Sequence, residues 1–397
     1  MIKTIIFAVL LLTVVIFLIA VIINCGSLAI CRIRHTDNSR IVSRIKKNTA
    51  ILSIVCVISC GFIWLTQLTT STPVIRSESG EIIEGSIAEL RQVTLNRRKE
   101  WISIRGNNQD NPVLLFLAGG PGGSQMAAVR HDLSELEKHF VVVNWDQPGA
   151  GKSYSAINPM DITVDTYIED GYELTKYLCE TFNQEKIYII GESWGSALGI
   201  FLIDKAPELY HAFIGTGQMI AFVETEIIDY ELALEIAREN GDTEKIRRLE
   251  ANGPPPYYGA DVTWKSAEYL NYLGSYMAQN PAIQNSDYNT FRDLFSSEYG
   301  IIDKINYLRG IVNTFNHVYP QLYEIDLRTD YASLDVPVYF FLGRHDINAP
   351  TSLVEEYFEV LEAPHKEIVW FEHSGHNPWI NESAAFVQQV LYVTNDR

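Results

Sequence analysis

The stretch Gly191-Glu192-Ser193-Trp194-Gly195 decides the fold class of this chain. It directly follows the apolar run 187–190 and precedes a stretch, 196–203, whose composition favours a helix. A Gly-x-Ser-x-Gly sequence between a strand and a helix is typical of a sharp turn that lifts a serine hydroxyl out of a sheet, because only small flanking residues let the backbone pass so closely. Ser193 is therefore the predicted nucleophile. The alternative is a glycine-rich turn with an incidental serine.

Around this turn, short β-rich runs alternate with helical patterns, which predicts the α/β class: a mostly parallel sheet covered by helices on both faces. Continuous apolar runs indicate strands that are buried on both sides. The predicted elements are an opening hairpin (93–95 and 101–104), strands at 113–117, 140–144, 186–190, 212–215, 336–342 and 367–371, a helix over 352–361 and a final helix after residue 378.

The pattern changes between about residues 219 and 333. Amphipathic helical segments rich in Glu and Tyr replace the strands there, so we expect a helical cap inserted into the core. The core itself is then expected over residues 85–218 and 334–397. A polar, Ser-rich segment, 71–84, is expected to link the core to the preceding part of the chain.

Two later strand ends carry the residues that a serine nucleophile needs. Asp346 follows the predicted strand that ends at Leu342, and His376 comes just after the one that ends at Phe371. We expect these side chains to meet Ser193, with His376 as the base and Asp346 as the carboxylate that orients it. The chain order Ser, Asp, His and the three strand-end positions together favour this arrangement. His373 is the alternative base.

An oxyanion site requires backbone amides beside the serine. The first amide of the helix after the nucleophile belongs to Trp194, and the loop 118–123, which reads Ala-Gly-Gly-Pro-Gly-Gly, follows the strand at 113–117. We expect the backbone N–H groups of Gly120 and Trp194 to hold the oxyanion. A plain tight turn is the alternative for this loop.

Composition limits the other possibilities. Four of the five cysteines lie in or beside the N-terminal apolar segments and only Cys179 lies in the predicted core, so neither a disulfide framework nor a thiolate metal site is expected there. We predict no metal site and no cofactor. Residues 1–74 hold seven basic residues and one acid, which leaves 24 basic and 48 acidic residues and a net charge of −24 after them. Nucleic acid is therefore excluded as a partner.

The first seventy residues are expected to form a membrane anchor of two transmembrane helices. Residues 5–23 are almost wholly apolar and approach the length needed to cross a bilayer, and residues 50–65 form a second apolar segment. Six basic residues and one acid lie between them, which places this loop in the cytoplasm by the positive-inside rule. The chain after residue 70 is then predicted to be extracytoplasmic, in a multi-pass protein of the cell membrane whose partner is the lipid bilayer.

Two alternatives stay open for this region. The second apolar segment is short and interrupted by Ser and Cys, so it could instead be a signal-like or interfacial segment. A cleaved signal peptide is the other alternative. It requires a small-residue cleavage pattern, which is absent between the first apolar run and Cys25, and it leaves the second run unexplained.

The motifs in their order resemble the prolyl iminopeptidase family of α/β-hydrolases over about residues 85–395. The resemblance rests on Gly-Gly-Pro-Gly-Gly after the third strand and on four further segments: Asp146-Gln147-Pro148-Gly149-Ala150-Gly151-Lys152-Ser153, Gly191 to Ser196, Gly343-Arg344-His345-Asp346 and Ser374-Gly375-His376. It implies an α/β-hydrolase fold with a helical cap and a Ser-His-Asp triad.

The chain departs from the family pattern at several positions. It has Ala118, Pro148 and Glu192 where members typically have His, Arg and Gly, and it reads Gly-Thr-Gly-Gln at 215–218 where they usually show Arg-Gly. In such enzymes, acidic cap residues bind the free α-amino group of the substrate. The resemblance therefore implies this role for acids early in the cap, where Glu224 and Glu226 are the candidates and Asp229 is a third. Solvated helix acids are the alternative for each.

The sequence thus predicts a membrane-anchored serine hydrolase. The resemblance implies an aminopeptidase that releases the N-terminal residue, proline or another small apolar residue, from short peptides. A carboxylic ester hydrolase that acts on another small molecule is the first alternative. A non-catalytic surface binding module is the second, and an intact set of Ser, His and Asp at three strand ends argues against it.

Overall fold

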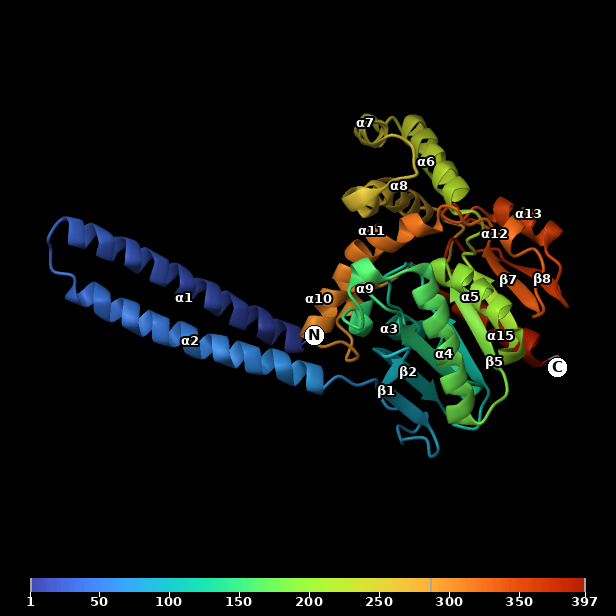
Figure 1. The fold of residues 1–397 in the computed structure, drawn as a ribbon, viewed down its shortest axis with the longest axis horizontal. Coiled ribbons are helices and arrows are strands. Elements are labelled where there is room, and N and C mark those ends of the chain that lie inside the picture. Colours follow the sequence, from blue (N-terminus) through green and yellow to red (C-terminus); the bar gives the residue numbers. More distant parts are fainter. Residues whose placement is uncertain (1, 286–287, 396–397) are drawn as a thin grey trace. The chain divides into compact units, whose positions relative to one another are not determined.

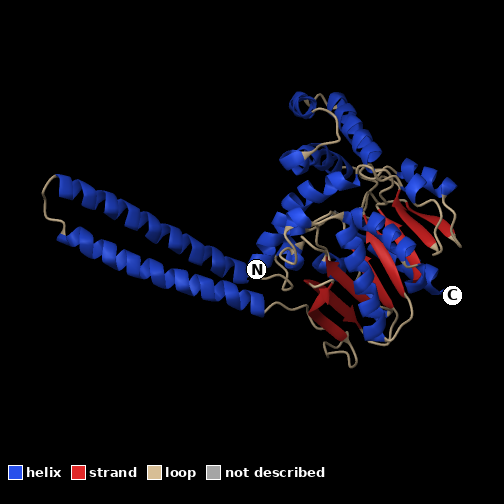
Figure 2. Ribbon diagram, viewed as in Figure 1, coloured by secondary structure: helices blue, strands red, loops and turns tan. Residues whose placement is uncertain are grey.

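A computed structural model describes residues 2–285 and 288–395 of the chain. Within these residues, eight strands form one sheet in the order β1-β2-β4-β3-β5-β6-β7-β8 (Figures 1 and 2). The strands are β1 (Ile87–Leu95), β2 (Arg98–Gly106), β3 (Val113–Leu117), β4 (Val141–Asp146), β5 (Ile187–Glu192), β6 (Tyr210–Thr216), β7 (Val338–Gly343) and β8 (Lys366–Phe371).

Only the first two pairings of this sheet are antiparallel: β1 with β2, and β2 with β4. From β4 to β8 all neighbours run parallel. The predicted mostly parallel sheet is therefore confirmed. Because the carboxyl ends of parallel strands lie at one edge, the residues that follow β3, β5, β6, β7 and β8 share that edge.

The central strands are buried on both faces, as their continuous apolar runs require. In β3, Leu114 and Phe116 belong to one hydrophobic cluster, whereas Val113, Leu115 and Leu117 belong to the other. This division follows from the alternation of side chains along a strand. The sheet thus separates two cores, one on each face.

Helices cover both cores. Leu174 and Leu198 come from helices that cover the first core, and Val129 and Phe386 come from helices that cover the second. The helices that follow β1 and lie outside the insert are α3 (Met126–Asp132), α4 (Val164–Phe182), α5 (Trp194–Lys205), α13 (Thr351–Val360), α14 (Pro378–Asn381) and α15 (Ser383–Asn395), with 3-10 turns η1 (Ser134–Lys138), η2 (Gly151–Ser153), η3 (Pro159–Asp161) and η4 (Pro207–Leu209).

The chain between β6 and β7 is a helical insert, as predicted. Its described residues contribute no strand to the sheet and form only isolated bridges, Ala221 with Asp326 inside the insert and Ser333 with Glu362. Its elements are α6 (Phe222–Glu239), α7 (Thr243–Asn252), η5 (Gly259–Asp261), α8 (Val262–Met277), α9 (Thr290–Leu294), α10 (Ile301–Arg309), the π-helical turn η6 (Gly310–Thr314), α11 (Phe315–Val318), η7 (Tyr319–Leu322) and α12 (Leu327–Asp330).

Two long helices precede the sheet: α1 (Ile2–Ile33) and α2 (Ser39–Leu68). Both are long and apolar enough to cross a membrane, and nearly all their residues are at least partly exposed. They form a hairpin (Figure 1). Within it, the Lys3 ammonium donates to the Thr69 carbonyl at 3.1 Å. Length and composition alone support a membrane role for this hairpin, so that role stays a prediction.

The chain divides into two compact units. One comprises residues 1–71 together with 295–304, and the other comprises 72–294 together with 305–397. The segment 295–304 lies in the range that the sequence assigns to the cap. Its backbone nevertheless bonds to the end of the helical hairpin, because the Ser71 amide donates to the Ser297 carbonyl at 3.1 Å and the Ile301 amide donates to Thr66 Oγ1 at 3.2 Å.

Candidate active site

Ser193 occupies the turn between β5 and α5 with φ 52° and ψ −121°, a strained conformation for a residue with a side chain. Its amide donates to the Thr216 carbonyl of β6 at 3.0 Å, and its carbonyl accepts from the Ser196 amide at 2.8 Å. A Cβ at Gly191 would collide with the Gly195 carbonyl, which explains why this turn needs glycine. The turn therefore holds Ser193 at the carboxyl edge of the sheet.

Asp346 and His376 meet at the same edge. The His376 ring nitrogen Nδ1 lies 2.9 Å from Asp346 Oδ2, and both side chains are buried. The other oxygen, Oδ1, accepts from the backbone amides of Asn348 at 2.8 Å and Ala349 at 3.0 Å. Two amides thus fix the carboxylate, and the carboxylate fixes the imidazole so that Nε2 faces away from it.

The alternative base lies elsewhere. His373 is exposed, its ring nitrogen Nδ1 lies 3.2 Å from the Ala282 carbonyl, and its amide donates to Glu382. His373 is thus an exposed loop residue bound to Ala282 and Glu382. Of the two histidines weighed as the base, His376 is the one that contacts Asp346.

The glycine-rich loop after β3 is tied to the serine turn through Gln147. The Trp194 indole donates to Gln147 Oε1 at 3.0 Å, and Gln147 Nε2 donates to the Ala118 carbonyl at 3.0 Å. The amide of Trp194 is the first of α5, and the first amides of a helix lack intrahelical acceptors. Gly120 has φ 140°, which positions its backbone in a way that side chains rarely allow.

Ser193, Gly120 and Trp194 line one small cavity of about 60 Å³ beneath the cap. Apolar side chains from the insert form much of its wall: Met219, Phe222, Leu270 and Phe315. A larger cavity of about 670 Å³ is lined by residues such as Tyr154, Arg309 and His317, away from the predicted site residues. The cavity at Ser193 is therefore the candidate active site.

Two cap acids reach this cavity from α6. Glu226 and Asp229 are three residues apart, so they share one face of the helix, and both are buried. Glu226 accepts from Tyr269, from Tyr319 at 2.8 Å and from Ser266 at 3.4 Å. Burial raises its pKa above the ordinary value.

Asp229 has different surroundings. Among the residues that the structure describes, neither of its carboxylate oxygens has a hydrogen-bond partner. Burial first, and then the nearby charges of Glu226 and Asp346, raise its pKa well above the ordinary value. Its surroundings therefore disfavour the ionised form of this carboxyl, and a cation bound beside it would favour that form.

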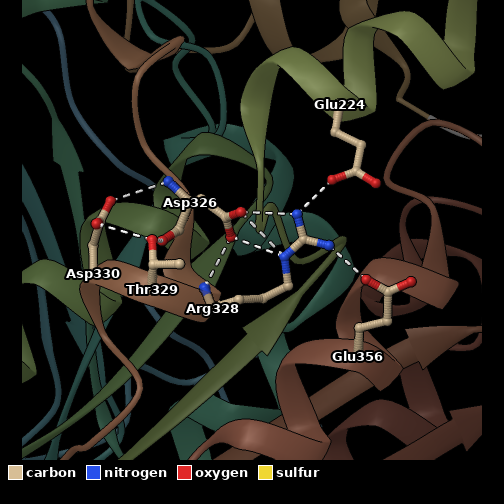
Figure 3. Close-up of polar contacts among 6 residues, drawn as sticks. All are labelled: Glu224, Asp326, Arg328, Thr329, Asp330 and Glu356. Atoms are coloured by element: carbon tan, nitrogen blue, oxygen red, sulfur yellow. Dashed lines mark hydrogen bonds and ion pairs between the residues drawn. The ribbon is translucent and has the colours of Figure 1, made fainter.

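Glu224 lies on another face of α6. Its side chain is 45% exposed and its carboxylate forms an ion pair with Arg328, which also binds Asp326 and Glu356 (Figure 3). Glu224 therefore fits the alternative that the sequence leaves open, a solvated acid on a helix surface. We therefore correct the candidate pair: Asp229, and not Glu224, accompanies Glu226 at the cavity.

Comparison with known proteins places this chain in a family. Residues 112–243 match the model of the alpha/beta hydrolase fold. The chain is 32% identical over 311 residues to the probable aminopeptidase YbaC of Bacillus subtilis, covering 77% of this chain and 96% of that protein. The chain belongs to the proline iminopeptidase-like α/β-hydrolases. A proline iminopeptidase of Saccharolobus solfataricus is 24% identical over 313 residues, covering 72% of this hydrolase and 85% of that protein.

Solved structures share the fold of this hydrolase. The proline iminopeptidase of Mycobacterium smegmatis aligns with a TM-score of 0.55 at 15% identity, covering 77% of this chain and 97% of that one. A bacterial membrane phospholipase A aligns with a TM-score of 0.53 at 17% identity, covering 78% and 87%. At such identities the likeness concerns the fold alone.

Sequence reasoning missed several residues of the hydrolase site. Tyr269 and Tyr319, which bind Glu226, lie 43 and 93 residues from it in the sequence. The only sequence signal for them is the high tyrosine content of the cap. Gln147 belongs to a segment that carries part of the family resemblance, but the bridge it makes to Ala118 and Trp194 requires the three-dimensional fold.

Proposed function

We propose that this protein is a membrane-anchored serine aminopeptidase that releases the N-terminal residue from short peptides. The observation that carries the proposal is the cavity in which Ser193 faces two buried cap carboxylates, Glu226 and Asp229. A serine nucleophile alone would serve an esterase equally well. Two acids placed beside it supply the recognition of a positively charged α-amino group.

The proposed reaction uses Ser193, His376 and Asp346 as a triad. The Ser193 oxygen attacks the carbonyl carbon of the first peptide bond while His376 Nε2 takes the hydroxyl proton, and Asp346 holds the imidazolium through Nδ1. The amides of Gly120 and Trp194 bind the oxygen that becomes negative. His376 then gives its proton to the leaving amine. Water, activated by the same histidine, hydrolyses the resulting ester and frees Ser193.

The cap acids explain why a free amino terminus is required. A primary α-ammonium group carries three N–H donors and that of proline carries two, and Asp229 offers two oxygens without partners among the described residues. A bound ammonium would favour the ionised form of Asp229 and satisfy both oxygens, which offsets the cost of their burial. Glu226 stands on the same helix face and is held by Tyr269 and Tyr319. The small apolar cavity favours proline or another small residue in the first position.

The test is a side-by-side turnover assay of the full-length protein in detergent. Prolyl, alanyl and leucyl arylamides are compared with a butyrate ester and with N-acetyl-prolyl arylamide, which differs from the first substrate only in its blocked amine. We expect turnover of the free-amine arylamides, with proline or alanine above leucine, and at least a 100-fold loss on acetylation, because the acetyl group removes the ammonium charge that the acids bind.

Two outcomes would decide against an aminopeptidase. Turnover of the butyrate ester with inert arylamides would make the protein an ester hydrolase. Inertness toward the whole panel in a folded sample would favour the binding module. Ser193→Ala is the matched control, because it removes only the nucleophilic oxygen and should abolish both turnover and labelling by a fluorophosphonate.

Membrane anchoring is the second part of the proposal. The hairpin of α1 and α2 exposes long apolar side chains along most of its length, for example Ile16, Ile19, Ile54 and Val57. Such surfaces need a lipid environment. The six basic residues between residues 32 and 47 put the connecting loop in the cytoplasm and the hydrolase outside it.

A further inference from the structure

Glu192, the residue before the proposed nucleophile, is a second buried carboxylate at His376. It ends β5 and is 2% exposed. Its Oε1 lies 3.7 Å from Nε2 of His376, the ring nitrogen opposite the one that Asp346 binds. The imidazole therefore has a carboxylate on each side.

The carboxylate of Glu192 is held in place by several donors. Gln125 Nε2 donates to Oε2 at 2.9 Å, and the Tyr288 hydroxyl and the Gly119 amide also hydrogen-bond to it. A side chain at position 119 would collide with Oε2, so glycine is needed for this close approach. Burial raises the pKa of Glu192, and the nearby imidazole and these three donors oppose that rise.

The separation between Glu192 and His376 distinguishes this contact from the one with Asp346. At 3.7 Å, Oε1 is beyond hydrogen-bond range of Nε2, so this contact is electrostatic and is not a hydrogen bond. A negative charge at this distance still attracts an imidazolium strongly, because the site is buried. The same residue also holds the Gly119 amide, next to the proposed oxyanion donor Gly120.

We propose that Glu192 is a positioning residue that stabilises the protonated form of His376 while Ser193 is acylated and that fixes the loop carrying Gly120. This inference rests on the proposed triad. It assigns a function to a position where this chain departs from the glycine typical of the family that it resembles. Glu192 itself exchanges no proton with the substrate.

The other titratable groups near Glu192 and His376 are the same in every variant of this test. Asp346 binds the other ring nitrogen of His376, Tyr288 binds Glu192, and Asp229 lies within electrostatic range of Asp346. Substituting Glu192 alone leaves all three in place. Changes in the pH profile can then be assigned to the Glu192 charge.

The experiment measures the second-order rate constant for labelling of the full-length protein by a fluorophosphonate between pH 4 and pH 9. In this reaction the Ser193 oxygen bonds to phosphorus, fluoride leaves, and His376 takes the serine proton. No knowledge of the natural substrate is required. Glu192→Gln keeps the size and the acceptor oxygen of the side chain and removes its charge.

We expect Glu192→Gln to move the acid limb of the profile about one pH unit lower, because the lost negative charge makes the imidazolium easier to deprotonate. The plateau rate should fall about 10-fold, since the base is weaker and the imidazolium of the transition state is less stabilised. Glu192→Asp should restore the position of the acid limb. The matched control Glu169→Gln, an exposed glutamate that pairs with Lys205, should match the unmodified protein.

The outcomes separate the two proposals. An acid limb and plateau unchanged in Glu192→Gln would overturn the role of Glu192 while leaving the triad intact. Absence of labelling in the unmodified protein would overturn the triad instead. If Glu192→Gln does not fold, Glu192→Asp and Glu192→Asn form a second pair that differs only in charge, and equal profiles for these two would overturn the inference.

Discussion

Asp346 binds His376 with one oxygen and two backbone amides with the other. Oδ2 lies 2.9 Å from the imidazole Nδ1, while the amides of Asn348 and Ala349 donate to Oδ1. The two carboxylate oxygens therefore have different kinds of partner. This difference determines how the amide group of an asparagine would be oriented at position 346.

We predict that Asp346→Asn lowers the labelling and turnover rates about 10³- to 10⁴-fold. The two backbone amides require an acceptor, so the asparagine oxygen will face them and its NH₂ group will face His376. The imidazole must then accept at Nδ1 and carry its proton on Nε2, where it cannot take the serine proton. Rate constants for fluorophosphonate labelling measure this loss. A variant that retains more than a tenth of the rate would contradict the assignment of Asp346.

Substitution of Asp229 should affect the substrate amine specifically. We predict that Asp229→Asn raises KM for prolyl arylamide about 10-fold or more, because a charged partner of the ammonium is replaced by a neutral amide. The rate of fluorophosphonate labelling, which needs no ammonium, should change far less. Steady-state kinetics on both reactions measure the difference.

Glu224→Gln is the matched comparison on the same helix. Its carboxylate binds Arg328 at the surface, so KM should not change. A rise in KM with Glu224→Gln and none with Asp229→Asn would restore the candidate that the structure argues against.

The raised pKa of Asp229 predicts a pH dependence of substrate binding. The ammonium needs the ionised carboxylate, and burial with the neighbouring charges of Glu226 and Asp346 makes ionisation harder. As pH falls, binding should weaken at a higher pH than an ordinary aspartate would cause. KM for prolyl arylamide measured against pH should therefore rise toward acid pH, and this rise should disappear in Asp229→Asn. A KM that does not rise toward acid pH would contradict the role of Asp229.

Membrane topology offers an independent prediction. A reporter that is active only outside the cytoplasm should be active when fused after Arg397 and inactive when fused within the loop between α1 and α2. The protein should also remain with membranes in alkaline carbonate. Replacing the six basic residues between residues 32 and 47 by Gln should weaken this orientation. Activity of both fusions would contradict the two-span anchor.

The fold was largely predictable because its central strands are continuous apolar runs. The outer hairpin was predicted too short: β1 begins at Ile87 and β2 extends to Gly106, whereas strands were expected only over 93–95 and 101–104. Charged side chains such as Glu89 and Arg91 occupy the outer strand β1, which needs no continuous apolar run because one of its edges is unpaired. Such a strand gives a weak sequence signal.

The strand ends identified Asp346 and His376 as partners because the parallel topology brings them to one edge. The cap acids show the limit of this reasoning. Glu224 and Glu226 are two residues apart, and on a helix such residues point to different sides. Which of them faces the cavity depends on how α6 packs against α8 and η7, which supply Tyr269 and Tyr319, and that packing is absent from any local pattern.

The bridge through Gln147 has a consequence for how this hydrolase can diversify. One buried amide joins the loop after β3 to the first residue of α5, so both proposed oxyanion donors belong to a single preassembled scaffold. This link between the two donors passes through neither α6 nor α8. Changes in α6 or α8 could redirect the enzyme toward new amino termini without rebuilding the machinery that breaks the bond.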